Sequence, residues 1–143
     1  MNNYDTDWET IEHILSTTET IAVVGLSSSR RRAGYYVPAY LQENGYRIIP
    51  VNPNLESALG EKAYPDLTSV PDSIDLVLIF RRSEHVRRPA ELAVEVGSKA
   101  VWMQLGIYNE EAAEIALNAG LKVVMDACML VEHRRWAGSA HKS

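Results

Sequence analysis

Hydroxyl and guanidinium side chains follow a short apolar segment near the start of the chain. Residues 20–26 read Thr-Ile-Ala-Val-Val-Gly-Leu, and three serines and three arginines come directly after them. Serine hydroxyls, backbone N–H groups and arginine forks are suited to binding phosphate oxygens. The stretch therefore predicts an anion site, with a plain connection carrying solvated arginines as the alternative. The candidate residues are Gly25, Ser27, Ser28, Ser29, Arg30 and Arg31.

A second group of arginines lies in the middle of the chain. Of 14 Lys and Arg residues, seven fall in the stretches 30–32 and 81–88, although the net charge is -5. Any bound anion must therefore be held by these local clusters of arginines and not by the net charge of the protein. The acidic balance also argues against nucleic-acid and anionic-membrane binding.

Strands and helices are predicted to alternate along the chain. Thr6 is expected to cap the first helix, in a capping box with Glu9. Ser83 is expected to cap the helix of about 84–97, and Asn109 the helix that ends at Gly120. Pro38 fits best in a first helical turn, so the second helix is expected to begin nearer Tyr36 than Ala33. The predicted strands are 20–25, 46–51, 75–80, 99–104 and 121–125, and the predicted helices are about 8–16, 33–44, 84–97 and 110–119.

This order predicts an α/β fold: a Rossmann-like, doubly wound, parallel five-stranded sheet with helices on both faces. The length of 143 residues fits one domain, 1–143, with its core at about 10–136. In such a sheet the carboxyl ends of the strands share one edge. The loops at 25–33, 52–55, 80–83 and 104–109 are expected to meet there and bring both arginine groups together.

The first βα turn lacks the usual dinucleotide fingerprint. Ser27 and Arg30 occupy the second and third glycine positions of G-x-G-x-x-G, and Asn52 stands where an acidic residue would hold the ribose hydroxyls. NAD is therefore disfavoured. NADP stays open, because arginines can bind its 2′-phosphate.

Five separated motifs together carry a family resemblance. They are residues 21–27, 46–53, 80–82, 100–106 and 125–128, the last followed by Glu132-His133. In this order they resemble the small bacterial CoA-binding proteins, a family similar to the N-terminal CoA-binding domain of the succinyl-CoA synthetase α subunit. The resemblance implies a Rossmann-like domain that binds coenzyme A, whose 3′-phosphate and pyrophosphate match the arginines.

The resemblance also implies particular contacts. The loop from Ser27 to Arg30 would hold phosphates, and Phe80 would close the floor of the site with Arg81. The Asn52-Pro53 corner would lie near the adenosine, and Gln104 and Gly106 would border the pantetheine. The synthetase domain that supplies a phosphohistidine has no counterpart in the sequence. We therefore expect binding of CoA or acyl-CoA without catalysis. An NADP-dependent enzyme and a CoA-binding component of a two-protein acyl-CoA ligase are the alternatives.

A few further residues could carry chemistry. Cys128 is expected to pack in the core, and as the single cysteine it cannot form an internal disulfide. His133 is expected at the surface or a helix end, Asp126 as a cap or a site residue, and His85 in a first helical turn near the crevice. No zinc-ligand spacing or apolar span of membrane length occurs. The protein is expected to be cytoplasmic; a homodimer or a protein partner stays open.

Overall fold

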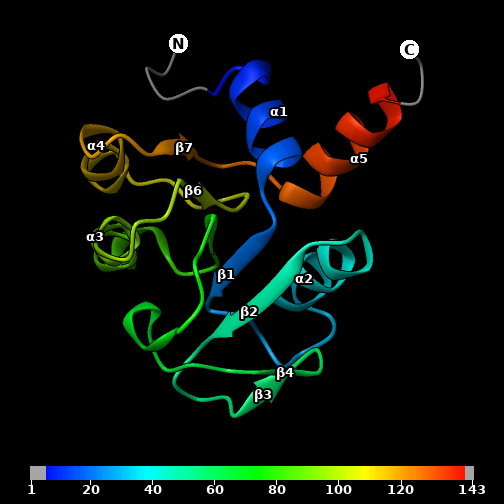
Figure 1. The fold of residues 1–143 in the computed structure, drawn as a ribbon, viewed down its shortest axis with the longest axis vertical. Helices are drawn as coiled ribbons and strands as arrows, with labels where there is room; N and C mark the ends of the chain where they lie inside the picture. Colours follow the sequence, from blue (N-terminus) through cyan, green and yellow to red (C-terminus); the bar gives the residue numbers. More distant parts are fainter. Residues whose placement is uncertain (1–5, 141–143) are drawn as a thin grey trace.

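A single parallel sheet forms the centre of the computed structural model, which describes residues 6–140 (Figure 1). Its strand order is β2-β1-β5-β6-β7, so β1 lies between β2 and β5. The predicted five-stranded α/β fold is confirmed. The strands are β1 (Thr20–Val24), β2 (Arg47–Val51), β5 (Leu76–Ile79), β6 (Ala100–Met103) and β7 (Lys122–Val124).

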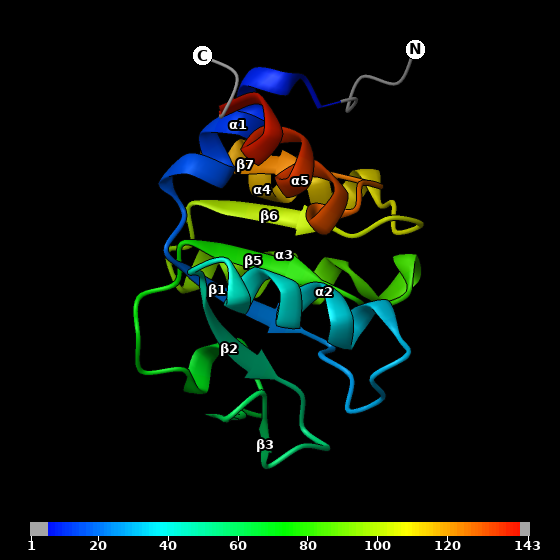
Figure 2. The same ribbon diagram turned by 90° about the vertical axis from the view of Figure 1, so that its right-hand side faces the viewer.

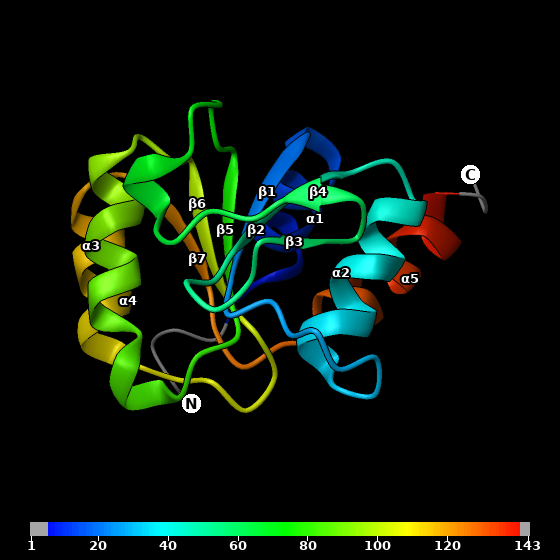
Figure 3. The same cartoon turned by 90° about the horizontal axis from the view of Figure 1, so that it is seen from below.

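Helices cover both faces of the sheet, as Figure 3 shows. One layer holds α3 (Arg87–Glu95) and α4 (Glu110–Asn118); the other holds α1 (Trp8–Thr17), α2 (Ala33–Glu43) and α5 (Met129–Ala140). Strand side chains alternate between the two layers: Val24 packs towards α3 and α4, and Val23 towards α1, α2 and α5. Among residues 6–140, no helix has the length and apolar character needed to cross a membrane.

The first and fourth helices are capped by acidic or amide side chains. The expected cap of α1 at Thr6 is wrong by one residue, because Asp7 accepts the Thr10 N–H at 2.8 Å. The expected cap of α4 is confirmed: Asn109 accepts the Ala112 N–H at 2.9 Å. Each cap satisfies an N–H group that the helix itself leaves without a partner.

Helix α2 begins at Ala33, so the expectation of a start near Tyr36 is wrong. Pro38 lies inside the helix and cannot donate to the carbonyl of Gly34. That carbonyl instead accepts the backbone N–H of Ser27 at 3.0 Å. The proline is tolerated because the preceding loop supplies the missing donor, and the same bond fixes that loop against the helix.

The segment between β5 and α3 also differs from the prediction. Ser83 belongs to a short 3-10 helix, η2 (Ser83–His85), and α3 has Val86 at its N-cap position with no side-chain cap. The Ser83 hydroxyl accepts the N–H of Tyr108 at 2.9 Å, and its carbonyl accepts from the Asn109 side chain at 2.8 Å. Ser83 thus joins the loops after β5 and β6 instead of capping a helix.

The edge of β2 is covered by the irregular chain that follows it. This stretch contains β3 (Ser57–Ala58), β4 (Glu61–Lys62) and η1 (Leu67–Ser69). Tyr64 donates to the carbonyl of Pro50 at 3.0 Å and accepts from Asn52 at 2.8 Å. The backbone nitrogen of Pro50 therefore faces the outer edge of β2, away from β1. The hydrogen bonds between β2 and β1 need no donor from this residue, as predicted.

Candidate functional site

The carboxyl ends of the five strands lie on one side of the molecule, where the strand arrows in Figure 2 point. The chain leaves β1 towards α2 on one face and leaves β5 towards α3 on the other face. Such a reversal between adjacent parallel strands opens a crevice beyond their ends. The predicted meeting of the loops at this edge follows from the observed strand order.

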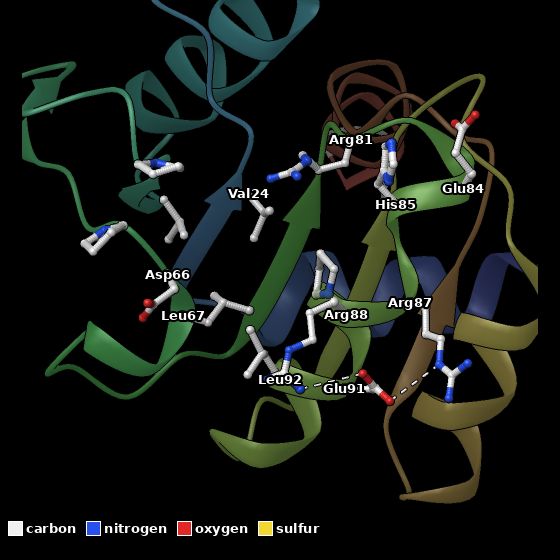
Figure 4. Close-up of a pocket in the computed structure, with 14 residues that line it drawn as sticks. Val24, Asp66, Leu67, Arg81, Glu84, His85, Arg87, Arg88, Glu91 and Leu92 are labelled. Carbon is white, nitrogen blue, oxygen red and sulfur yellow. Dashed lines mark ion pairs between the residues drawn. The ribbon is translucent and has the colours of Figure 1, made fainter.

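A pocket of about 380 Å³ lies at this edge, on the α3 side of β1 (Figure 4). Its size falls in the range of roughly 300–1,000 Å³ seen for small-molecule sites. One wall is apolar, and the other carries both basic and acidic side chains from Arg81, η2 and α3. The lining residues are Val24, Val51, Pro53, Pro65, Asp66, Leu67, Arg81, Glu84, His85, Arg87, Arg88, Pro89, Glu91 and Leu92.

Gly25 directly follows Val24, the residue of β1 that lines the pocket, and its glycine character is required there. Its φ is +86°, and a Cβ atom would lie 2.9 Å from the carbonyl oxygen of Phe80 and 3.3 Å from Cδ of Arg81. Real Cβ atoms do not approach so closely, and side chains avoid this φ. The turn after β1 can therefore pack directly on the segment that carries Arg81.

The loop between Gly25 and α2 is folded by its own serines. The Ser27 hydroxyl accepts the N–H of Ser29 at 3.0 Å, while the Ser27 N–H donates to Gly34. Ser28 and Ser29 are exposed, and Ser27 is half-buried. The loop thus presents two exposed hydroxyl groups beside the start of a helix.

The helices on either side of β1 begin with arginines, against the preference of the helix dipole. Helix α2 has Arg32 at its N-cap position without a side-chain cap, and α3 carries Arg87 and Arg88 in its first turn; neither has an acidic residue there. By contrast, α1 and α4 begin with acidic residues, as the positive helix end favours. Both helix starts at this edge therefore carry arginines in place of the acidic side chains that the positive helix end favours.

The arginines at this edge differ in their partners. Arg87 pairs with Glu91 at 3.5 Å and Glu111 at 2.8 Å, and Arg88 lies 3.7 Å from Glu91. Arg81 takes no part in the ion pairs of residues 6–140, and in Figure 4 its guanidinium extends from the end of β5 towards Val24.

In the α2 loop, Arg30 lies over the ring of Tyr35 at 5.9 Å, and Arg31 is exposed. Both predicted arginines are thus at the expected edge, with Arg30 held over an aromatic ring.

The two residues of the predicted Asn52-Pro53 corner have different structural roles. Asn52 donates from its side-chain amide to the carbonyl of Leu26 at 2.9 Å and accepts the N–H of Asn54 at 2.9 Å. It therefore ties the β2 turn to the β1 turn. Pro53 lines the pocket together with Arg81.

Of the twelve predicted site residues, Pro53 and Arg81 line the pocket, and the other ten, among them Phe80, Gln104 and Gly106, lie outside its lining. Phe80 is half-buried against the cluster under α2 and α5. Gln104 is only 3% exposed, and its Oε1 accepts the N–H of Met129 at the start of α5 at 3.2 Å. Gly106 is exposed, with its N–H donated to Asp126 Oδ1 at 2.7 Å. These bonds fix the loop after β6 at the same edge of the sheet.

Several pocket residues were missed from the sequence. Pro65 and Leu67 come from the irregular stretch after β4, which has no periodic pattern to place it. Leu92 has the spacing of a core residue, and the structure shows it also lining the pocket. His85 is at the crevice as expected, but in η2 rather than in the first turn of α3.

Histidine and cysteine side chains on or near α5 are structural here. The expectation of a surface His133 is wrong: it is 5% exposed, hydrogen-bonded through Nδ1 to the Tyr40 hydroxyl at 2.7 Å. Burial lowers its pKa. Cys128 is half-buried against the core cluster under α1, α2 and α5, as expected. Across residues 6–140 no cluster of His, Cys, Asp and Glu could hold a metal ion.

Known proteins resemble this chain over most of its length. The uncharacterized protein YneT of Bacillus subtilis is 42% identical over 123 residues, covering 86% of this chain and 91% of YneT. The solved structure of a hypothetical protein from Pyrococcus horikoshii matches with a TM-score of 0.91 at 38% identity, over 96% of this chain and 97% of that one.

A longer enzyme also contains a similar segment. The ADP-forming acetate–CoA ligase II of Archaeoglobus fulgidus is 28% identical over 117 residues, which cover 73% of this chain and 17% of the ligase. The chain thus corresponds to a small part of that enzyme.

The strand order and the crevice beside β1 define an α/β domain of the Rossmann-like class. The profile of the CoA binding domain family matches residues 19–134, and the chain belongs to that family. The resemblance found from the sequence motifs is confirmed.

Proposed function

We propose that this protein binds coenzyme A or acyl-CoA at the carboxyl edge of the sheet. The observation that carries the proposal is the pair of arginine-bearing helix starts, α2 and α3, on either side of the end of β1, with a pocket on the α3 side. CoA is a multiply charged anion with a flat heterocycle, which suits cationic helix ends beside a partly apolar pocket. Membership of the CoA binding domain family supports the same ligand.

The residues present fit the parts of this ligand. The α2 side offers exposed hydroxyls on Ser28 and Ser29 and the helix start for the pyrophosphate. The pocket walls formed by Val24, Pro53 and Leu67 suit the adenine ring. The loop from Gln104 to Gly106, fixed by its bonds to residues 126 and 129, would border the pantetheine chain.

We infer that binding, rather than catalysis, is the role of this domain. Among the groups that could act as acid, base or nucleophile, His133 is enclosed by aromatic rings and Cys128 packs on the core. His85 lies at the pocket, where a hydrogen-bond donor serves an anionic ligand.

Calorimetric titration with CoA, acetyl-CoA and NADP at two salt concentrations tests the proposal. We expect dissociation constants on the order of micromolar or tighter for CoA, weakened by salt, and much weaker NADP binding. A preference for NADP would instead support the alternative of an NADP-dependent enzyme. Binding of neither nucleotide would overturn the proposal.

A second candidate role is the CoA-binding component of an acyl-CoA ligase with another chain. The similarity to part of an ADP-forming acetate–CoA ligase favours it. An assay for CoA-dependent, ADP-forming acyl-CoA chemistry, with and without added candidate partner chains, distinguishes the two roles. Turnover that requires both chains would establish the ligase role.

A further inference from the structure

The basic side chains at the carboxyl edge fall on two sides of the end of β1. Arg30 and Arg31 belong to the loop that leads into α2, and Arg81 and His85 belong to the segment that leads into α3. Gly25 separates them, and the Arg81 side chain packs so closely that a Cβ at Gly25 would lie 3.3 Å from its Cδ. A ligand with one phosphate group would need only one of these sites.

Arg81 is the pocket-lining arginine that takes part in none of the ion pairs of residues 6–140. Arg87 and Arg88 are balanced by Glu91, and Arg87 also by Glu111. In Figure 4, Arg81 extends across the pocket towards Val24, with the His85 ring beside it on the same wall.

The remaining carboxylates of the pocket turn elsewhere. Asp66 Oδ1 accepts from Thr68 and Ser69 at the start of η1, and these hydrogen bonds lower its pKa. In Figure 4 its carboxyl group lies across the pocket from Arg81 and points away, and Glu84 points away beyond His85. The space beside Arg81 and His85 therefore favours an anion.

Coenzyme A carries its two phosphorylated positions on one ribose. The 5′ position bears the pyrophosphate and the 3′ position bears a single phosphate, with adenine on the same ring. If adenine enters the apolar pocket, the ribose lies at its mouth, between the two cationic groups. A pyrophosphate directed to the α2 start leaves the 3′-phosphate on the α3 side.

We propose that Arg81 and His85 bind the 3′-phosphate of coenzyme A, so that this domain distinguishes CoA from dephospho-CoA. The inference rests on the proposed CoA-binding function. The guanidinium fork can make two parallel hydrogen bonds to phosphate oxygens, and the imidazole can donate a further one. Arg30 and Arg31 would then serve the pyrophosphate, which both ligands share.

Titration of CoA, dephospho-CoA and adenosine 3′,5′-bisphosphate against the protein and its Arg81→Ala and His85→Gln variants tests this assignment. We expect the unchanged protein to prefer CoA over dephospho-CoA by roughly tenfold or more, as a charged hydrogen bond allows. Arg81→Ala should lose most of that preference by weakening CoA alone, and His85→Gln should lose part of it. Circular dichroism checks that each variant is folded.

Arg82→Ala is the matched control, because Arg82 is the neighbouring exposed arginine and does not line the pocket. It should keep the preference for CoA. Equal losses of CoA and dephospho-CoA binding in Arg81→Ala, or equal binding of both by the unchanged protein, would overturn the 3′-phosphate assignment while leaving CoA binding intact. Failure of both CoA and dephospho-CoA to bind the unchanged protein would instead contradict the proposed function itself.

Discussion

The side-chain amide of Asn52 donates a 2.9 Å hydrogen bond to the backbone carbonyl of Leu26. The bond joins the turn after β2 to the turn after β1, and its oxygen accepts from Asn54 in the same turn. In many dinucleotide-binding domains an acidic residue near this position contacts the ribose. Here the amide instead holds the loop that leads to α2 in place.

Replacing Asn52 with alanine should therefore lower both stability and CoA affinity. Two hydrogen bonds are lost and a partly buried carbonyl loses its donor, which costs about 1–3 kcal/mol in the free energy of unfolding. Urea denaturation and CoA titration measure the two effects. Asn54→Ala is the control, because only the backbone of Asn54 takes part in this turn. Unchanged stability in Asn52→Ala would contradict the bracing role.

Gly25→Ala should be much more destabilising than alanine at a glycine with free space. Both Gly25 and Gly120 have positive φ, +86° and +89°, but a Cβ at Gly120 meets nothing within 4 Å. Gly120→Ala should cost about 1–2 kcal/mol for its backbone conformation alone. Gly25→Ala should add about 1–3 kcal/mol from the clash with Phe80 and Arg81. Equal losses of unfolding free energy in the two variants would show that the close approach is not rigid.

Arg32→Ser should stabilise the protein and weaken its ligand binding. Arg32 occupies the N-cap of α2 without capping it, and its backbone already has the extended conformation that a serine cap requires. A capping serine is worth about 1 kcal/mol, and the change also removes a positive charge from the helix start. The midpoint temperature of thermal unfolding without ligand should rise, while CoA titration should give a larger dissociation constant.

The control for this substitution is Asp7→Ala at the cap of α1. It removes a cap that exists, so it should destabilise the protein by a similar amount and leave CoA affinity unchanged. A variant Arg32→Ser that is more stable and binds CoA equally well would mean that the arginine at this helix start does not serve the ligand.

Stability should fall on mild acidification because of His133. The imidazole lies among the rings of Tyr40, Tyr46 and Trp136, with the Arg134 guanidinium over the Tyr40 ring. Burial lowers its pKa below the ordinary 6.5, so the unfolded chain binds a proton at a pH where the folded protein does not. Stability present above about pH 6.5 is therefore lost as the pH falls from there towards the folded pKa.

Urea denaturation at a series of pH values measures this dependence. His133→Phe should flatten the curve between neutral and mildly acidic pH, even if its stability at neutral pH is lower. His13→Gln is the control, since His13 is exposed on α1 and should leave the curve unchanged. A curve that keeps its slope in His133→Phe would assign the acid sensitivity to other groups.

The sequence predicted the sheet well because buried parallel strands have a strong local signal. Continuous apolar runs such as Leu76–Ile79 are typical of strands buried on both faces, and the Asn109 cap needs only local residues. The predictions failed where residues distant in the sequence determine the local structure. Pro38 is accommodated by the Ser27 N–H, and Ser83 is recruited by Tyr108 and Asn109.

The candidate site shows the same division. The glycine, the serines and both groups of arginines are visible in the sequence because one turn and one helix start contain them. Pro65 and Leu67 could not be placed, since their stretch reaches the pocket through the irregular chain after β4. The buried position of His133 depends on Tyr40 and Tyr46, which approach it from other elements.

The central claim is that CoA binds between the starts of α2 and α3. The most direct measurement is the change in backbone amide NMR signals as CoA is added to the isotope-labelled protein. We predict the largest changes in residues 25–34 and 81–88, with smaller ones at 104–107, and little change at Asp75 and Lys99 on the opposite edge of the sheet. Saturating changes confined to that opposite edge, or no changes with CoA in large excess, would contradict the account.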